Sequence, residues 1–204
     1  MENREILSAA DRKRRLRAEL LQARTAMPES FFREAGEALR QQLKSLPAWR
    51  DARVVFAFLS TAGEPETRGI IRDAAEAGKT VLLPRCLPGG RMEALPFSGW
   101  ERLVRGRFGL WEPEADSGPA LAPDLILVPC LGVSPTGGVR LGRGGGYYDR
   151  YLARTAGTAV CLCPEEFLRE GIPAEETDVP VGWIATGRRM IRCTGPEEGK
   201  TRGE

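Results

Sequence analysis

The sequence contains no histidine at all. Imidazole is the usual base in Ser-His and Cys-His nucleophilic catalysis, a metal ligand in H-E-x-x-H sites and the commonest acid–base group near neutral pH. Its absence therefore excludes these classes of hydrolase and metalloenzyme. What remains is chemistry that depends on positioning and electrostatics, with lysine, arginine, carboxylates and backbone amides as its tools.

The chain also lacks long apolar runs and a paired arrangement of cysteines. No run approaches the roughly 18 residues of a transmembrane helix, and the N-terminus has no apolar core like that of a signal peptide. We therefore expect a cytoplasmic protein with no membrane partner. The cysteines are odd in number and form no C-x-x-C, so we expect reduced, mostly buried thiols and no zinc site. They are Cys86, Cys130, Cys161, Cys163 and Cys193.

A large excess of charge of one sign is missing as well. Lysines and arginines number 30 against 28 acidic residues, and the formal net charge is +2. No overall field favours nucleic acid or an anionic membrane as a partner. With 204 residues, 42% of them hydrophobic, the chain can bury a sizeable core. We predict one domain over residues 1–194, with helices in 1–46, and a disordered tail at 195–204, where no apolar residue occurs.

The order of the predicted elements indicates the architecture. The predicted helices are residues 9–27, 28–46, 66–77 and 146–154, and the predicted strands are 53–59, 80–84, 124–129 and 158–163. The strands are apolar throughout, as in a parallel sheet that is covered on both faces. Residues 84–101 and 112–123 are rich in proline and glycine and read as loops, with a short strand possible at 91–96. The expected fold is an α/β three-layer sandwich with a mostly parallel central sheet, preceded by an N-terminal helical arm.

A glycine-rich stretch, "GVRLGRGGGYYDR" from Gly138 to Arg150, follows the predicted strand 124–129 and leads into a helix. Ligands of open α/β sheets bind at such places. The stretch is not G-x-x-x-x-G-K-[ST], because no Lys-Ser/Thr follows, and not G-x-G-x-x-G, because Tyr147 stands at the third glycine position. A nucleotide-binding fold therefore cannot be assigned from those motifs.

The physical character of this stretch still favours a phosphate ligand. Its glycines let the backbone approach a ligand closely, and the amides at the start of the next helix point toward it. Arg140 and Arg143 add positive charge. Asp149 then has no obvious reason to face an anion unless Mg²⁺ lies between them. The alternative is a flexible loop with solvated arginines, in which Asp149 only complements the helix dipole.

A basic segment in the first predicted helix is a second candidate. Lys13 and Arg17 are four residues apart and share a helix face that borders the apolar stripe of Leu16 and Leu20. They should therefore lie beside the body of the protein. A solvated basic helix fits the neighbouring arginines, Arg12, Arg14 and Arg15, better.

These residues carry a resemblance to a known family. "RLGRGGGYYDRYL" resembles the signature of the 5-formyltetrahydrofolate cyclo-ligases, also called 5,10-methenyltetrahydrofolate synthetases. The N-terminal "KRRLR" resembles the K-x-x-L-R element of the family, and "FLSTAGEPET", "RFGLWEP", "DLILVP" and "IPAEETDVPV" resemble further landmarks in the same order. The resemblance implies an enzyme that uses ATP and Mg²⁺ to convert 5-formyltetrahydrofolate to 5,10-methenyltetrahydrofolate, with release of ADP and phosphate.

The resemblance also implies site residues. Catalytic roles fall to Arg143 and Lys13, and Mg²⁺ ligation falls to Asp149 and Asp178. The implied ATP-binding residues are Lys13, Arg14, Arg17, Arg140, Leu141, Gly142, Arg143, Gly144, Gly145, Gly146, Tyr147 and Tyr148.

The implied folate contacts are Leu59, Glu64, Phe108 and Tyr147. From the residues alone, Glu64 could equally be a solvated loop residue, Phe108 a core aromatic and Asp178 a turn residue. The stretch from Pro129 to Ser134 departs from the family's P-G-x-A/G-F-D, and a family glutamine near Phe167 is missing. The departures at Val133 and Ser134 permit one alternative, a relative with a changed acceptor. A second alternative is a non-catalytic nucleotide- or folate-binding protein, which the presence of Glu64, Asp149 and Asp178 disfavours. We expect a monomer whose small-molecule partner is a reduced folate.

Overall fold

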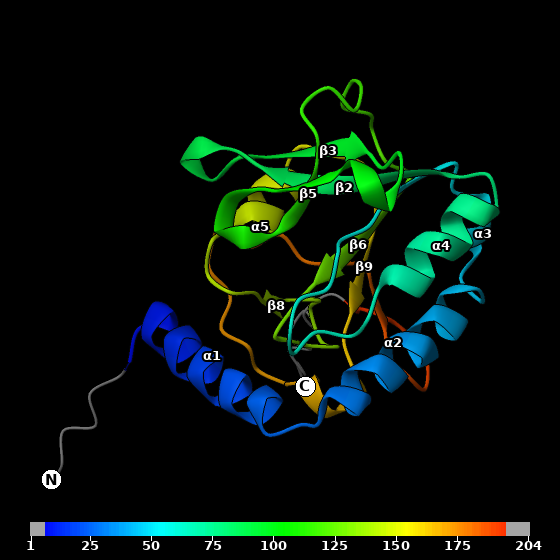
Figure 1. Cartoon of the computed structure of the whole chain (residues 1–204). Helices are drawn as coiled ribbons and strands as arrows, with labels where there is room; N and C mark the ends of the chain where they lie inside the picture. The colour runs from blue at the N-terminus through cyan, green and yellow to red at the C-terminus, as the bar shows by residue number, and fades with distance from the viewer. Residues whose placement is uncertain (1–6, 195–204) are drawn as a thin grey trace, which may run out of the picture.

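A computed structural model describes residues 7–194 and shows a central sheet between two layers of helices (Figure 1). Seven strands follow the order β11-β10-β9-β6-β1-β2-β3. β1 pairs in parallel with β2 and β6, and β9 pairs in parallel with β6 and β10. Only the edge strands β3 and β11 run antiparallel to their neighbours. The predicted α/β sandwich with a mostly parallel sheet is confirmed.

The elements have the following bounds. The helices are α1 (Ala9–Thr25), α2 (Glu29–Leu43), α3 (Pro47–Asp51), α4 (Arg68–Glu76) and α5 (Tyr147–Leu152). The strands of the main sheet are β1 (Val54–Phe56), β2 (Thr80–Cys86), β3 (Met92–Pro96), β6 (Leu125–Pro129), β9 (Thr158–Leu162), β10 (Trp183–Ala185) and β11 (Met190–Arg192). Two small antiparallel pairs are β4 (Leu103–Arg105) with β5 (Trp111–Pro113), and β7 (Gly132–Val133) with β8 (Arg140–Leu141).

Alternation along the strands divides the core into two clusters. Val55 belongs to the cluster that contains buried side chains of α2, α3 and α4, whereas its neighbour Phe56 belongs to the one that contains Tyr151 and Leu152 of α5 and Leu20 of α1. Successive strand residues point to opposite faces of a sheet, so apolar strands of this kind need cover on both sides. Figure 1 shows α2 and α4 on one side of the sheet and α5 on the other.

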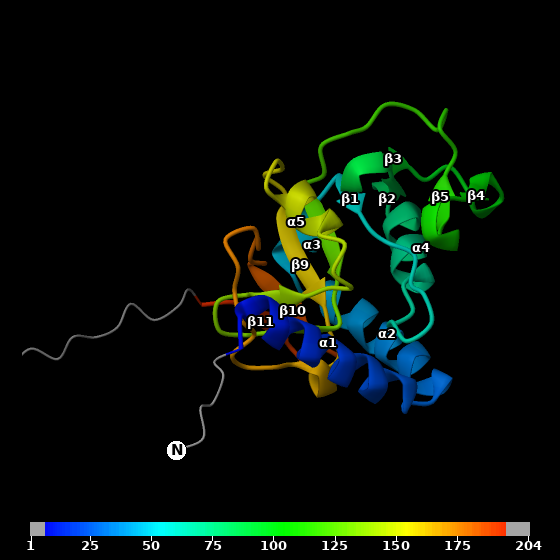
Figure 2. The ribbon, with the colours of Figure 1, turned by 90° about the vertical axis from the view of Figure 1, so that its left-hand side faces the viewer.

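The N-terminal helix α1 begins as predicted. Ser8 is its N-cap, and the Ser8 hydroxyl accepts a hydrogen bond from the backbone N–H of Asp11. The helix lies across the front of the molecule in Figure 2 and leads into the start of α2. None of the helices in residues 7–194 combines the length and apolar character that a membrane crossing requires.

Several boundaries differ from the sequence-based expectation. The second helix ends at Leu43, and α3 is a separate helix because Leu46 is extended and Pro47 starts a new first turn. The strand predicted over residues 53–59 is limited to Val54–Phe56. Residues 84–101 and 112–123 are not wholly loop, since β2 continues to Cys86, β3 spans 92–96 and β5 ends at Pro113. The expected tail at 195–204 lies outside the described residues.

Gly36 in α2 offers a test of how α2 packs on the segment before α4. A Cβ at this position would lie 2.3 Å from the backbone oxygen of Glu66. Alanine favours a helix over glycine by about 1 kcal/mol, but overpacking costs about 1–3 kcal/mol. We expect Gly36→Ala to lower the free energy of unfolding, measured by urea denaturation.

Gly69→Ala in α4 is the matched control for this substitution. A Cβ there would meet only the side chain of Arg40, at 3.1 Å, and a long side chain can move aside. This variant should be as stable as the parent or more stable. Equal stabilisation by both substitutions would contradict the close packing at Gly36.

Candidate active site

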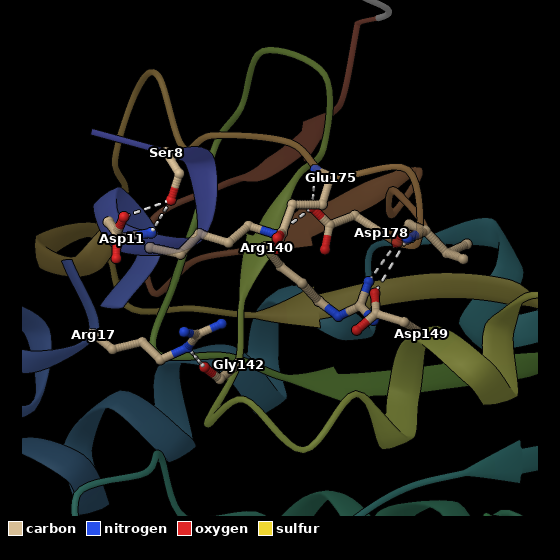
Figure 3. A network of polar contacts seen from close by, with 10 residues as sticks. Ser8, Asp11, Arg17, Arg140, Gly142, Asp149, Glu175 and Asp178 are labelled. Atoms are coloured by element: carbon tan, nitrogen blue, oxygen red, sulfur yellow. Dashed lines mark hydrogen bonds and ion pairs between the residues drawn. The ribbon is translucent and has the colours of Figure 1, made fainter. Parts of the chain in front are cut away.

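The glycine loop, residues 142–146, connects β8 to α5 beside the carboxyl ends of the central strands. Gly144 and Gly146 have φ values of 96° and 65°, which residues other than glycine rarely adopt. Arg17 of α1 donates a 3.0 Å hydrogen bond from Nε to the carbonyl of Gly142, and Arg150 donates to the carbonyl of Gly145 (Figure 3 shows the first). Protein side chains thus hold the loop near both ends.

Arg143 projects from the glycine loop toward the loop that follows β1, residues 57–67, which we call the β1 loop. Its side chain is 55% exposed, and its guanidinium lies 3.1 Å from Thr61 Oγ1 and 3.3 Å from Glu64 Oε1. The other carboxylate oxygen of Glu64 accepts the backbone N–H of Thr61 at 2.8 Å. The structure therefore joins Arg143, a predicted phosphate-binding residue, and Glu64, a predicted folate-binding residue, in one ion pair.

Lys13 is buried against the body of the protein, as its helix face predicts. Only 3% of its side chain is exposed, and its ammonium lies 2.7 Å from Glu175 Oε2 and 2.5 Å from Asp178 Oδ2. The same Asp178 oxygen accepts the backbone N–H of Glu175 at 2.8 Å. Asp178 also occupies a turn, because its N–H donates to the carbonyl of Glu175.

Asp149 on α5 has a protein partner that the sequence did not reveal. Arg140 is buried and donates to Asp149 Oδ1 at 2.8 Å, and the backbone N–H of Val179 donates to the same oxygen at 3.1 Å (Figure 3). The premise that Asp149 needs Mg²⁺ to explain its place was wrong, since Arg140 is sufficient. The bond from Val179 nevertheless brings Asp149 beside the segment that carries Asp178.

The two aspartates are suitable for a magnesium ion. In each, one oxygen accepts all the hydrogen bonds from residues 7–194, so Asp149 Oδ2 and Asp178 Oδ1 remain available. Mg²⁺ usually keeps several waters and takes one or two protein carboxylates in addition to phosphate oxygens. The described residues contain no group of three or more potential metal ligands. The residues therefore fit Mg²⁺ held jointly with phosphate, and they do not form an all-protein site.

Phe108 lies at the tip of the β4–β5 hairpin and is 67% exposed, so the alternative that it packs in the core is wrong. Its φ is +60°, the only positive value of a non-glycine residue in the described chain. Its ring meets that of Tyr147 edge to face, with centroids 6.1 Å apart. The structure thus places two of the four predicted folate contacts side by side, while another of them, Leu59, is half-buried against the α2–α4 core cluster.

Tyr148 packs against the core cluster that contains Phe56. Its ring stacks on Phe56 at 6.2 Å, and its hydroxyl is buried without a hydrogen-bond partner in the described chain. Burial, followed by the charge of Glu64, raises the pKa of this hydroxyl. The phenol therefore stays protonated and can donate to a ligand that reaches it.

Two predicted ATP ligands lie apart from this cluster. Arg14 is 78% exposed and pairs with Asp11 in its own helix, as expected of a solvated basic position. Leu141 is buried in the core below the glycine loop. Its carbonyl accepts the N–H of Leu131 at 2.7 Å, so Leu141 supports the loop from within the protein.

Sequence reasoning missed two residues that shape the site. Glu175 shares Lys13 with Asp178, and no sequence pattern distinguishes it from the neighbouring acidic residues. Arg24 is buried and bonds to loops after both β1 and β6. Its position seven residues after Arg17, on the same helix face, was an available signal.

Comparisons with known proteins agree with this geometry. A model of the 5-formyltetrahydrofolate cyclo-ligase family matches residues 9–187. A 5-formyltetrahydrofolate cyclo-ligase of Mycolicibacterium smegmatis is 36% identical over 189 residues, with 88% of this chain and 95% of the relative covered. One from Escherichia coli K12 is 30% identical over 177 residues, with 83% and 97% covered.

A solved structure with the same fold is the NMR structure of Aquifex aeolicus 5,10-methenyltetrahydrofolate synthetase. It matches with a TM-score of 0.78 at 27% identity and covers 94% of this chain and 96% of that one. Since the family match spans most of the sequence and includes α1, the β1 loop and the glycine loop, this chain belongs to the 5-formyltetrahydrofolate cyclo-ligase family.

Proposed function

We propose that this chain converts 5-formyltetrahydrofolate to 5,10-methenyltetrahydrofolate with ATP as co-substrate and with the residues above in defined roles. One observation is the main support for the roles that we assign to these residues. The Arg143–Glu64 ion pair connects the glycine loop to the β1 loop. A phosphate held by the first loop and a pterin held by the second would therefore meet at one place.

The reaction, as the family resemblance implies it, requires alignment more than proton transfer. The N5-formyl oxygen attacks the γ-phosphorus of ATP and ADP leaves. N10 then closes onto the activated formyl carbon and loses its proton to solvent, and the transferred phosphate departs with the formyl oxygen. Such a sequence needs two ligands held in line and a charge that is stabilised as it spreads. It needs no imidazole, which the sequence lacks.

The phosphate end of the site consists of cations and glycine-loop amides. Arg143 is partly exposed and can turn from Glu64 to a phosphoryl group, while Arg17 fixes the loop through Gly142. Lys13 is neutralised by Glu175 and Asp178 without a nucleotide. A phosphate would replace one of these carboxylates as its partner. Mg²⁺, when bound by Asp149 and Asp178, would neutralise phosphate charge.

The folate end consists of the β1 loop and the β4–β5 hairpin. Glu64 can accept hydrogen bonds from pterin N–H groups, because a carboxylate is an acceptor for adjacent donors. Phe108 and Tyr147, whose rings meet edge to face, supply aromatic surface. Leu59, in the same β1 loop, is the fourth proposed folate contact.

The departures from the family sequence lie inside the protein. Val133 is fully buried, and Ser134 Oγ lies 2.7 Å from the carbonyl oxygen of Thr136 and 3.2 Å from Glu170 Oε2, either of which can accept its single hydrogen. Phe167 is buried and stacks on Phe32. Since these side chains contact protein groups, they offer no surface for a different acceptor, and this favours the family's folate.

The proposed activity is tested by mixing the protein with ATP, Mg²⁺ and 5-formyltetrahydrofolate and following the absorbance of the methenyl product. We expect product to form, and ADP to be released only when the folate is present. ADP release that requires another acceptor would indicate a relative with a changed substrate. Tight ATP binding without turnover would indicate a binding protein.

Asp149→Asn tests the proposed magnesium ligand. An asparagine Oδ1 can still accept from Arg140 and Val179, but the free oxygen becomes an amide nitrogen that cannot bind a cation. We expect a higher Mg²⁺ requirement that excess metal partly overcomes, measured from the Mg²⁺ dependence of the rate.

Arg143→Ala is the contrasting variant for the metal test. Loss of one charge-stabilising donor should raise the activation free energy by about 2–4 kcal/mol, and so lower kcat, at every Mg²⁺ concentration. If Asp149→Asn has the parent's Mg²⁺ dependence, Asp149 serves only as the partner of Arg140.

Phe108→Gly separates the stability of the hairpin from folate binding. A non-glycine residue at positive φ costs about 1–3 kcal/mol, and the exposed ring returns little burial. We expect an unchanged or higher melting temperature together with a KM for 5-formyltetrahydrofolate raised several-fold. Phe108→Ala should raise that KM equally but melt lower than Phe108→Gly, because it keeps the strained backbone. An unchanged KM in both variants would contradict the aromatic-wall role.

A further inference from the structure

Arg24 is a buried arginine without an acidic partner. It lies in the last turn of α1 with only 3% of its surface exposed, and no carboxylate of residues 7–194 forms an ion pair with it. Removing a charge from water is costly unless the protein supplies other partners. What Arg24 bonds to therefore indicates why it is buried.

All of the hydrogen bonds from Arg24 go to backbone carbonyls of two loops. NH1 donates to Gly63 of the β1 loop at 2.5 Å. NH2 donates to Cys130 and Leu131 at 3.0 Å each, and Nε donates to Leu131 at 3.3 Å. The β1 loop and the turn at 130–131 follow the carboxyl ends of adjacent parallel strands, β1 and β6. One side chain thus spans both strand ends.

Aromatic rings complete the surroundings of the guanidinium. Its carbon lies 4.2 Å from the ring centre of Phe167 and 5.9 Å from that of Phe32. These contacts hold the flat group in one orientation and exclude water. A planar guanidinium can bond several carbonyls at fixed angles, whereas a lysine ammonium on a flexible stem cannot.

The residue next to one of these carbonyls is Glu64, the proposed pterin ligand. The backbone oxygen of Gly63 is held by Arg24, and the Glu64 side chain begins at the next residue along. The helix that carries Arg24 also carries Lys13 and Arg17, which meet the phosphate end of the site. Arg24 therefore joins the N-terminal helix α1 to the β1 loop.

We propose that Arg24 is a positioning residue that fixes the position of the β1 loop, which carries the proposed folate contacts, relative to the N-terminal helix. This inference rests on the proposed function and adds a residue that touches neither substrate. Without the bond to Gly63, the β1 loop keeps its turn bond from Glu64 to Thr61 but is no longer attached to α1. The folate site is then displaced, while the phosphate contacts of Lys13 and Arg17 remain.

The test is Arg24→Met, which keeps length and apolar contact with the phenylalanines but removes every bond to the loops. Equilibrium titration should show at least a tenfold weaker affinity for 5-formyltetrahydrofolate without ATP, and an ATP affinity within about twofold of the parent. Arg24→Lys should recover part of the folate affinity.

Arg169→Met is the matched control. Arg169 also contacts α1, with Nε 3.8 Å from Glu19, but among the described residues its side chain donates hydrogen bonds only to the carbonyls of Glu166 and Leu168. The affinity of the Arg169→Met variant for 5-formyltetrahydrofolate should equal that of the parent. Parent-like folate affinity in Arg24→Met, or equal losses for folate and ATP that follow a lower melting temperature, would overturn the proposal. If Arg24→Met does not fold, Arg24→Lys decides by the same comparison.

Hydrogen exchange separates this inference from the proposed reaction. Faster exchange of the Thr61 and Glu64 amides in Arg24→Met, and not in Arg169→Met, would show that Arg24 holds the loop, whatever the substrate. A parent protein that forms no methenyl product would reject the reaction before any variant is made. Unchanged exchange at both amides would reject the positioning role even if the parent is active.

Discussion

The candidate site depends on how one helix is attached to the sheet by its cations. Three residues on one side of α1 reach three different segments: Lys13 reaches the turn at 175–178, Arg17 reaches the glycine loop, and Arg24 reaches the strand ends of β1 and β6. Only Lys13 pairs with acidic side chains. The other two bond to carbonyls, so they fix backbone positions and leave the site with unneutralised positive charge. That charge suits a site for phosphate.

The carboxylates of the site are arranged in a complementary way. Within the part of the chain that the structure describes, Asp149 and Asp178 each use one oxygen for protein donors and leave the other free, whereas Glu64 uses both of its oxygens for Thr61 and Arg143. A bound anion can therefore exchange places with acidic side chains without leaving buried cations unpaired. Exchange of this kind limits the desolvation cost that a permanently empty cationic pocket would carry.

The sequence predicted what depends on local patterns. The central strands are apolar runs, α1 has a cap and a stripe, and the glycine loop combines glycines with arginines in one short stretch. It did not predict β10 and β11, because strands of three residues are too short to show a period. It also missed the pairing of Asp149 with Arg140 and the loop contacts of Arg24. These contacts join segments far apart in the chain, and only the fold brings them together.

The β4–β5 hairpin carries the one conformation in the described chain that folding alone does not explain. An exposed phenylalanine gains little from burial, and a positive φ adds strain, so neither folding nor solubility explains Phe108. The conformation is imposed by its surroundings: Glu112 is buried beneath Gly106, where a Cβ would lie 2.1 Å from its carboxylate, and its other oxygen accepts the N–H of Cys86 on β2. The hairpin is thus fixed to the sheet at its base, while its tip presents a strained aromatic ring to Tyr147. Strain that the neighbouring packing maintains at an exposed position is typical of a ligand contact, and here the ring lies against the helix that begins at the glycine loop.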